Sequence, residues 1–220
     1  MVMLGAMPAS PITPAPHPFS AARWRGLRVG LLGGSFDPAH AGHMHIAIQA
    51  MIRLHLDAVW WLVSPGNVLK TAKPSTDYAR RIARTREFVH HPRMAVTDIE
   101  GQLGTRYTRD TLRALKRRFP ATHFIWIAGM DNAATFDRWA HWRALPRIVP
   151  FAFFERPPAL SKIKAKRVRQ DRRLRQRTKS GSHRLKPKET GVFWMTGGPG
   201  VDLSSTFLRR NFAQGHDSGV

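Results

Sequence analysis

Short apolar runs alternate with amphipathic stretches along the middle of the chain, and this alternation predicts the fold. The apolar runs are rich in Val, Ile, Phe and Trp, as strands buried on both faces of a sheet tend to be. We predict strands at Leu27–Leu32, Ala58–Val63, Met94–Ile99, His123–Ala128, Val149–Phe154 and Val192–Thr196. Between them, apolar positions recur at helical spacing, and we predict helices at His43–Leu56, Asp77–Val89, Thr108–Arg118 and Ala133–Leu145.

Regular alternation of strand and helix predicts an α/β, Rossmann-like single domain. Right-handed crossovers then give a mostly parallel sheet with helices on both faces. Ligands in such sheets bind beyond the carboxyl ends of the strands, near the switch in strand order. The loops that we expect at this edge are Gly33–Ala41, Ser64–Thr76, Glu100–Tyr107 and Gly129–Ala133.

The length of 220 residues suits one domain, which we place at residues 27–213, with a short tail at 214–220. The chain has no run of apolar residues long enough to span a bilayer. The absence of cysteine excludes disulfides, thiolate nucleophiles and cysteine zinc sites, and it fits a cytoplasmic protein. Residues 1–26 form a leader that is rich in Pro and Ala, lacks the pattern of a secretory signal and is expected to be disordered.

The net charge of +22 is concentrated in one segment. Between Ser161 and Lys188 there are thirteen Lys or Arg residues and one acid, Asp171. A block of like charge is typical of a solvated, disordered insert or of an interaction tail. We expect 161–188 to be such an insert, and nucleic-acid binding through it stays open as an added property rather than the main function.

The loop from Gly33 to His43 carries the residues with the clearest chemistry. Its adjacent glycines let a ligand approach the backbone, and the helix start that follows offers N–H groups to a phosphate. His40 and His43, three residues apart, can donate hydrogen bonds to oxygens that gain negative charge. The loop is neither a dinucleotide fingerprint nor a P-loop. A tight turn with exposed histidines is the alternative, and a zinc site with His45 is disfavoured because no cysteine or carboxylate stands at ligand spacing.

The same run, GGSFDPAHAGH, resembles the His-x-Gly-His signature of the nucleotidyltransferase superfamily, and its first half resembles nicotinate-nucleotide adenylyltransferases. Leu203–Arg209 resembles the second family motif, Ile-Ser-Ser-Thr-x-Ile-Arg. Further segments that resemble the family are Ser64–Lys70, Thr105–Leu112 with Arg106 in place of serine, and Gly129–Asn132 followed by Trp139 and Trp142. The resemblance covers residues 28–210 apart from the insert.

This resemblance implies transfer of the adenylyl group of ATP to nicotinate mononucleotide, in NAD biosynthesis, with pyrophosphate as the other product. It implies catalysis by His40 and His43. ATP and phosphate binding is implied for Gly33, Gly34, Ser35, Phe36, Gly42, Lys70, Gly129, Asp131, Ser204, Ser205, Thr206 and Arg209. Binding of the mononucleotide is implied for Tyr107, Thr108, Trp139 and Arg81.

Several alternatives remain at this stage. The acceptor could instead be nicotinamide mononucleotide or phosphopantetheine. Taken alone, Trp139 and Trp142 would be core aromatics, Tyr107 and Thr108 a helix start, and Arg81 a solvated charge. Few acids stand near the motifs, so we expect Mg²⁺ to arrive on ATP and no metal ligands in the protein. A homo-oligomer stays open.

Overall fold

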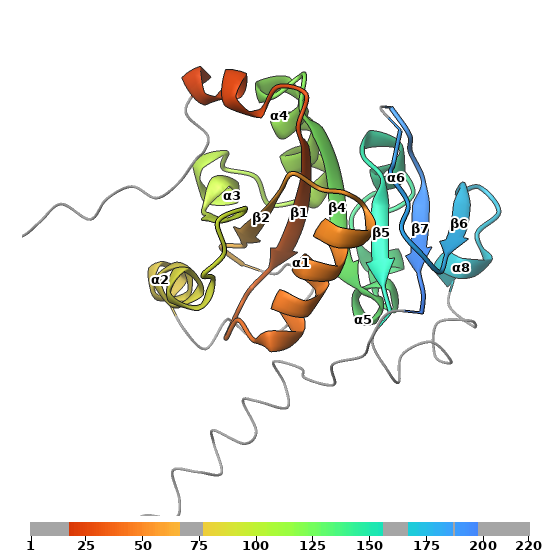
Figure 1. The fold of residues 1–220 in the computed structure, drawn as a ribbon, viewed down its shortest axis with the longest axis horizontal. Coiled ribbons are helices and arrows are strands. Elements are labelled where there is room, and N and C mark those ends of the chain that lie inside the picture. Colours follow the sequence, from red (N-terminus) through yellow and green to blue (C-terminus); the bar gives the residue numbers. More distant parts are fainter. Residues whose placement is uncertain (1–17, 67–76, 156–166, 187, 198–220) are drawn as a thin grey trace, which may run out of the picture.

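The core of the protein is one sheet of seven parallel strands in the order β3-β2-β1-β4-β5-β7-β6 (Figure 1). The structure is a computed structural model that describes residues 18–66, 77–155, 167–186 and 188–197. The strands are β1 (Arg28–Gly34), β2 (Ala58–Val63), β3 (Met94–Thr97), β4 (His123–Gly129), β5 (Phe151–Phe154), β6 (Gln176–Lys179) and β7 (Val192–Met195). Six of them lie where the sequence predicts strands, and the expected Rossmann-like α/β fold is confirmed.

Helices cover both faces of this sheet. They are η1 (Pro18–Trp24), α1 (Ala41–Arg53), α2 (Tyr78–Phe88), α3 (Ile99–Gln102), α4 (Thr108–Arg118), α5 (Met130–Ala133), η2 (Phe136–Arg138), α6 (Leu145–Ile148) and α8 (Arg167–Gln170). The apolar residues of α1 and α2 join one buried cluster, and those of α4, α5 and α6 join another on the opposite face. Among the described residues, no helix is long and apolar enough to cross a membrane.

The strand order creates a switch point between β1 and β4. From β1 the chain builds β2 and β3 on one side, then returns to place β4 on the other side of β1. Because all strands run parallel, the loops that follow β1 and β4 emerge side by side at the carboxyl edge. This arrangement brings the loop Gly33–His43 next to Gly129–Asp131.

The long helix predicted at Ala133–Leu145 is wrong. The chain instead forms α5, then η2, then turns, and becomes helical again at α6. Trp139 is extended, with φ −72° and ψ 139°, and His141 has a positive φ of 55°, so both leave the helical region. Apolar spacing alone cannot show this break, because the same aromatic side chains are buried by short turns.

The expectation of a disordered leader over residues 1–26 is wrong for residues 18–26. Trp24 is 6% exposed, and its ring meets Trp60 edge to face at 4.9 Å. The carbonyl of Trp24 accepts a hydrogen bond from the Thr122 hydroxyl at 2.9 Å, and Gly26 N–H donates to the carbonyl of Ala121. A single large aromatic residue therefore anchors this segment to the sheet.

The expectation of a disordered insert at 161–188 is wrong for residues 167–186. These residues form α8 and β6, and β6 pairs in parallel with β7 as the last strand of the sheet. Three apolar side chains, Val168, Leu174 and Leu185, are buried. The composition of the segment does not reveal them, because charged residues predominate. Their burial removes apolar area from water and so stabilises the segment.

Candidate active site

Two histidines stand at the N-terminus of α1. His40 is the N-cap residue, and its Nδ1 accepts the Gly42 N–H at 3.1 Å, while the Nδ1 of His43 accepts the His40 N–H at 3.3 Å. Each ring thus takes the place of the oxygen side chain usual in a capping box. Because Nδ1 accepts in both rings, a neutral ring carries its proton on Nε2, which makes Nε2 the donor.

Contacts between aromatic rings restrict the orientation of these histidines. The centroids of the His40 and His43 rings lie 3.9 Å apart at an interplanar angle of 36°, and the Phe36 ring meets that of His43 edge to face at 5.0 Å. Phe36 is 2% exposed, packs on Trp61 at 5.1 Å and has a positive φ of 44°. The Phe36 side chain therefore packs against His43 and Trp61, and its predicted contact with ATP stays a prediction. Gly34 allows this packing, since a Cβ there would lie 3.2 Å from the Phe36 ring.

Arg81, predicted to bind the mononucleotide, is buried and joins the two loops beside the histidines. It is 1% exposed, and its guanidinium donates to the carbonyls of Ser35, at 2.6 Å, and Ser64, at 2.9 Å. A further hydrogen bond runs to the carbonyl of Pro65 at 3.1 Å. Burial lowers the pKa of Arg81, and the nearby carboxylate of Asp37 opposes that change. These contacts give Arg81 a positioning role, which differs from the prediction.

Two glycines and one tryptophan pack closely at the carboxyl ends of β1 and β4, where the strand order switches. A Cβ on Gly33 would come within 2.5 Å of the Trp126 ring, so the close approach of β1 to this indole requires glycine. A Cβ on Gly129 would collide with the Asp131 carboxylate, which folds back over it at the start of α5. Asp131 itself is exposed at the carboxyl edge, where the sequence places it.

The start of α4 presents backbone amides at the same edge of the sheet. Tyr107 is its N-cap residue, 41% exposed, and makes no side-chain cap, while Thr108 begins the helix. Behind them, the Thr111 hydroxyl lies 2.8 Å from the Thr105 hydroxyl and 3.4 Å from Oε1 of Glu100. Burial raises the pKa of Glu100 to about 7, and its hydrogen bond with Thr111 acts in the opposite direction.

Trp139, predicted to stack on the substrate, lies partly exposed after η2. Its ring meets Trp126 at 5.8 Å with an interplanar angle of 87°, and Phe136 at 5.4 Å. Trp142, in contrast, is buried in the core. Two nearly perpendicular neighbours set the plane of Trp139 while leaving part of the ring accessible.

Sequence reasoning missed three residues that shape this region. Trp126 and Trp61 lie inside predicted strands, where nothing in the sequence marks them as part of a site. Glu100 lies on α3, and the Thr111 hydroxyl of α4 lies 3.4 Å from its Oε1. Burial of a carboxylate is visible only in three dimensions. The other predicted phosphate ligands, Lys70, Ser204, Ser205, Thr206 and Arg209, lie outside the described residues.

Comparison with known proteins shows the family of this chain. The Cytidylyltransferase-like family matches residues 31–211. A probable nicotinate-nucleotide adenylyltransferase from Cereibacter sphaeroides is 46% identical over 181 residues, which cover 82% of this chain and 96% of that protein. One from Methylorubrum extorquens is 43% identical over 183 residues, covering 83% and 99%.

Among solved structures, the nicotinic acid mononucleotide adenylyltransferase of Plasmodium falciparum, complexed with NaAD, has the same fold. It superposes with a TM-score of 0.62 at 17% identity and covers 84% of this chain and 83% of that one. The long match to the family and the high identity to its bacterial relatives settle the relationship. The chain belongs to the Cytidylyltransferase-like family and, within it, to the nicotinate-nucleotide adenylyltransferases.

Proposed function

We propose that this protein transfers the adenylyl group of ATP to nicotinate mononucleotide and releases pyrophosphate, a step of NAD biosynthesis. A phosphate oxygen of the mononucleotide forms a bond to the α-phosphorus of ATP, and the bond from that phosphorus to the pyrophosphate oxygen breaks. The observation that carries the proposal is the pair of histidines held by backbone N–H groups at the switch point. The high identity to named relatives supports the same reaction.

In this mechanism the protein positions the reactants and stabilises charge. The attacking phosphate is already an anion, so no base is needed to create the nucleophile. His40 and His43 would donate from Nε2 to the oxygens of the α-phosphate, where negative charge develops, and the N-terminus of α1 adds its dipole. The fixed orientation of the two imidazole rings would help catalysis, because an in-line displacement requires the attacking phosphate and the α-phosphate to be held in one geometry.

The mononucleotide would lie between Trp139 and the start of α4. The backbone N–H groups of the first turn, beginning at Thr108, can donate hydrogen bonds to the nicotinate carboxylate, because the N-terminal N–H groups of a helix have no partner within it. Tyr107 borders this place, and the pyridine ring would stack on Trp139. A neutral carboxamide gains less from the same dipole, which favours the nicotinate acceptor.

The remaining contacts of ATP rest on sequence resemblance. Gly33, Gly34, Ser35 and Gly42 would offer backbone to the phosphates, while Asp131 would contact a ribose. Lys70 and Arg209 would neutralise the triphosphate, with Ser204, Ser205 and Thr206 as hydrogen-bond donors.

The described residues do not build a site for a resident metal. No group of three or more His, Cys, Asp or Glu side chains that could hold a metal ion occurs among them. Nucleotidyltransferases of this family use a divalent metal with ATP, and we propose that Mg²⁺ enters as part of the substrate Mg·ATP. We place the reaction in the cytoplasm, on the absence of cysteine in the chain.

The test is pyrophosphate release from Mg·ATP with three acceptors offered in turn: nicotinate mononucleotide, nicotinamide mononucleotide and phosphopantetheine. We expect release mainly with nicotinate mononucleotide. Release mainly with another acceptor would preserve the roles of the histidines but overturn the assignment of Trp139 and Thr108. No release with any acceptor would overturn the proposed function.

A further inference from the structure

The ordered part of the insert displays positive charge at one edge of the molecule. In Figure 1, α8 and β6 lie at the end of the sheet opposite α2 and α3, and β5 and β7 separate β6 from β4. Residues 167–186 contain nine Lys or Arg and a single acid. Two of the exposed cations, Arg184 and Lys186, follow β6, and Arg184 interacts with Arg28 at the start of β1. The other five exposed cations lie on α8 and in the turn between α8 and β6: Arg167, Arg169, Arg172, Arg173 and Arg175. We call this surface the basic edge.

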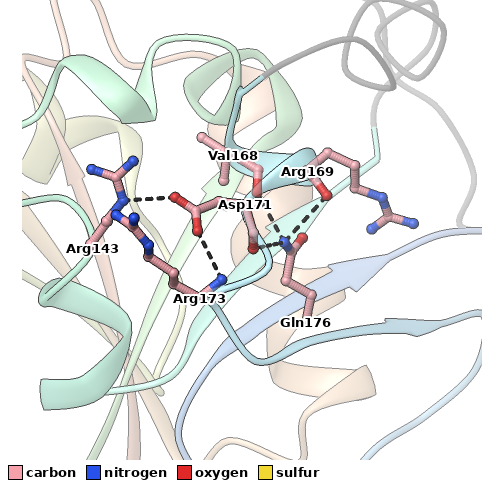
Figure 2. Close-up of polar contacts among 6 residues, drawn as sticks. All are labelled: Arg143, Val168, Arg169, Asp171, Arg173 and Gln176. Carbon is pink, nitrogen blue, oxygen red and sulfur yellow. Dashed lines mark hydrogen bonds and ion pairs between the residues drawn. The ribbon is translucent and has the colours of Figure 1, made fainter.

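The acids near the basic edge do not neutralise its exposed cations. Asp171 pairs with Arg143, which lies outside the segment, at 2.7 Å (Figure 2). Glu189, just beyond the segment, pairs with Arg177. Within the described part of the chain, Arg172 and Arg175 make no ion pair. The positive charge of this edge therefore faces solvent.

A hydrogen-bond network holds the backbone of the segment that carries these cations. The carboxamide of Gln176 donates to the carbonyls of Val168 and Asp171, each at 3.0 Å, as Figure 2 shows, and its oxygen accepts from Trp194 at 2.9 Å. Arg169 lies over the Trp194 ring at 4.8 Å. These contacts tie the backbone of α8 to the sheet, so the arginines project from an ordered backbone and binding has to order only their side chains.

A second anchor joins the other end of the segment to α1. Arg53, 8% exposed, donates to the carbonyls of Lys179, at 3.1 Å, and Thr196, at 2.7 Å. The backbone N–H of His183 donates to the Arg53 carbonyl. The segment 167–186 is thus fixed to the folded domain at both of its ends.

We propose that the basic edge binds the phosphodiester backbone of a nucleic acid. Arginine predominates over lysine there, and the planar guanidinium matches phosphate oxygens in a bidentate way. The large exposed apolar side chains of the described residues are Ile48 and Ile52 on α1 and Tyr107 before α4, and none of them is on α8 or β6, so the edge itself lacks the apolar anchors of a membrane-binding face. It also lacks exposed aromatic rings for stacking bases, which makes duplex backbone a better match than single strands.

Binding of this kind depends on charge and not on sequence. Each phosphate contact releases counterions, and replacing three contacting arginines lowers the slope of log affinity against log salt by about 2 to 3. The sites proposed for ATP and nicotinate mononucleotide are at the carboxyl ends of β1 and β4, away from β6 in the strand order, so we expect binding at the basic edge and adenylyl transfer to be separable.

The experiment measures fluorescence anisotropy of labelled duplex RNA, duplex DNA and single-stranded RNA with the full-length protein over a series of salt concentrations. The test variant replaces Arg167, Arg172 and Arg175 by alanine; the matched control replaces the exposed Arg84, Arg113 and Arg117, on α2 and α4. We expect the test variant to bind duplex at least about tenfold more weakly near 100 mM salt, with the smaller salt slope. The control should bind like wild type, and all three proteins should keep the same melting temperature and pyrophosphate release.

A second test variant with glutamine at the same three positions keeps side-chain length, should the alanine variant fold poorly. The RNA and DNA duplexes distinguish the two sources of backbone. Unchanged affinity in both test variants, an equal loss in the control, or no binding by wild type overturns the proposal. A rise in the KM for ATP without nucleic-acid binding would also overturn it, and would mean that the edge steers anionic substrates.

Discussion

The loop Gly33–His43 and the basic edge are both rich in polar residues, but they differ in where the polar side chains lie. In the loop, polar side chains turn inward: His40 is 4% exposed and its ring caps the backbone of α1. In the basic edge, five cations are exposed to solvent, while Val168 and Leu174 are buried. The comparison shows that the role of a side chain can be predicted from the sequence where its contacts are with neighbours in the chain. It cannot be predicted where the contacts come from distant segments.

The largest expected effect is at the loop. Replacing His43 by alanine removes one donor to the α-phosphate, and we expect kcat for pyrophosphate release to fall about 10²- to 10³-fold. The matched control is the exposed His90→Ala, which should leave kcat unchanged. Equal rates in the two variants would remove His43 from the reaction.

The next effect distinguishes the glycines of the two regions. Gly33→Ala forces a Cβ against Trp126, and we expect the free energy of unfolding to fall by about 2 to 3 kcal/mol. Gly181→Ala, in the basic segment, meets nothing within 4 Å and should cost far less. Urea unfolding of both variants measures the difference, and similar losses would mean that the close approach of β1 to Trp126 is not tight.

A smaller effect tests whether the basic edge is part of the folded domain. Gln176→Leu leaves the carbonyls of Val168 and Asp171 and the Trp194 N–H without this partner, and we expect a loss of about 1 to 2 kcal/mol in the free energy of unfolding. Gln170→Leu, exposed on α8, is the control. If hydrogen exchange in α8 and β6 is unchanged by Gln176→Leu, the network does not hold the segment.

The smallest effect is a pH dependence at the start of α4. Burial raises the pKa of Glu100 from 4.5 to about 7, so the folded protein binds this proton more tightly than the unfolded chain does. The stability from this group is complete below pH 4.5 and is lost as pH rises toward 7. Glu100→Gln should flatten the curve of stability against pH by about 1 kcal/mol in this window, after screening by solvent. A curve identical to wild type would exclude Glu100 as the titrating group.

Much of the fold was predictable because its signals are local. Strands such as Ala58–Val63 are continuous apolar runs, and the loop motif places both histidines at a helix start. The edge strand β6 was not predictable, because its sequence, Gln-Arg-Thr-Lys, has no apolar residue and is a strand only through pairing with β7.

Within the site, the sequence identified positions better than roles. Phe36 and Arg81 are predicted to contact ligands, and the structure adds that the Phe36 ring packs on His43 and the Arg81 guanidinium donates to the carbonyl of Ser35. Their partners, Trp61 and the carbonyl of Ser64, lie on a neighbouring strand and the loop that follows it. A motif in the sequence cannot predict a role that depends on such long-range contacts.

The central claim, that the histidines stabilise a direct transfer and carry no covalent adenylyl group, is tested most directly by stereochemistry. The substrate is an ATP analogue with one sulfur on the α-phosphorus in a single configuration, and the configuration of the dinucleotide product is determined. One displacement in line predicts inversion at that phosphorus. Retention would require two displacements through an adenylyl-enzyme, and would contradict the account.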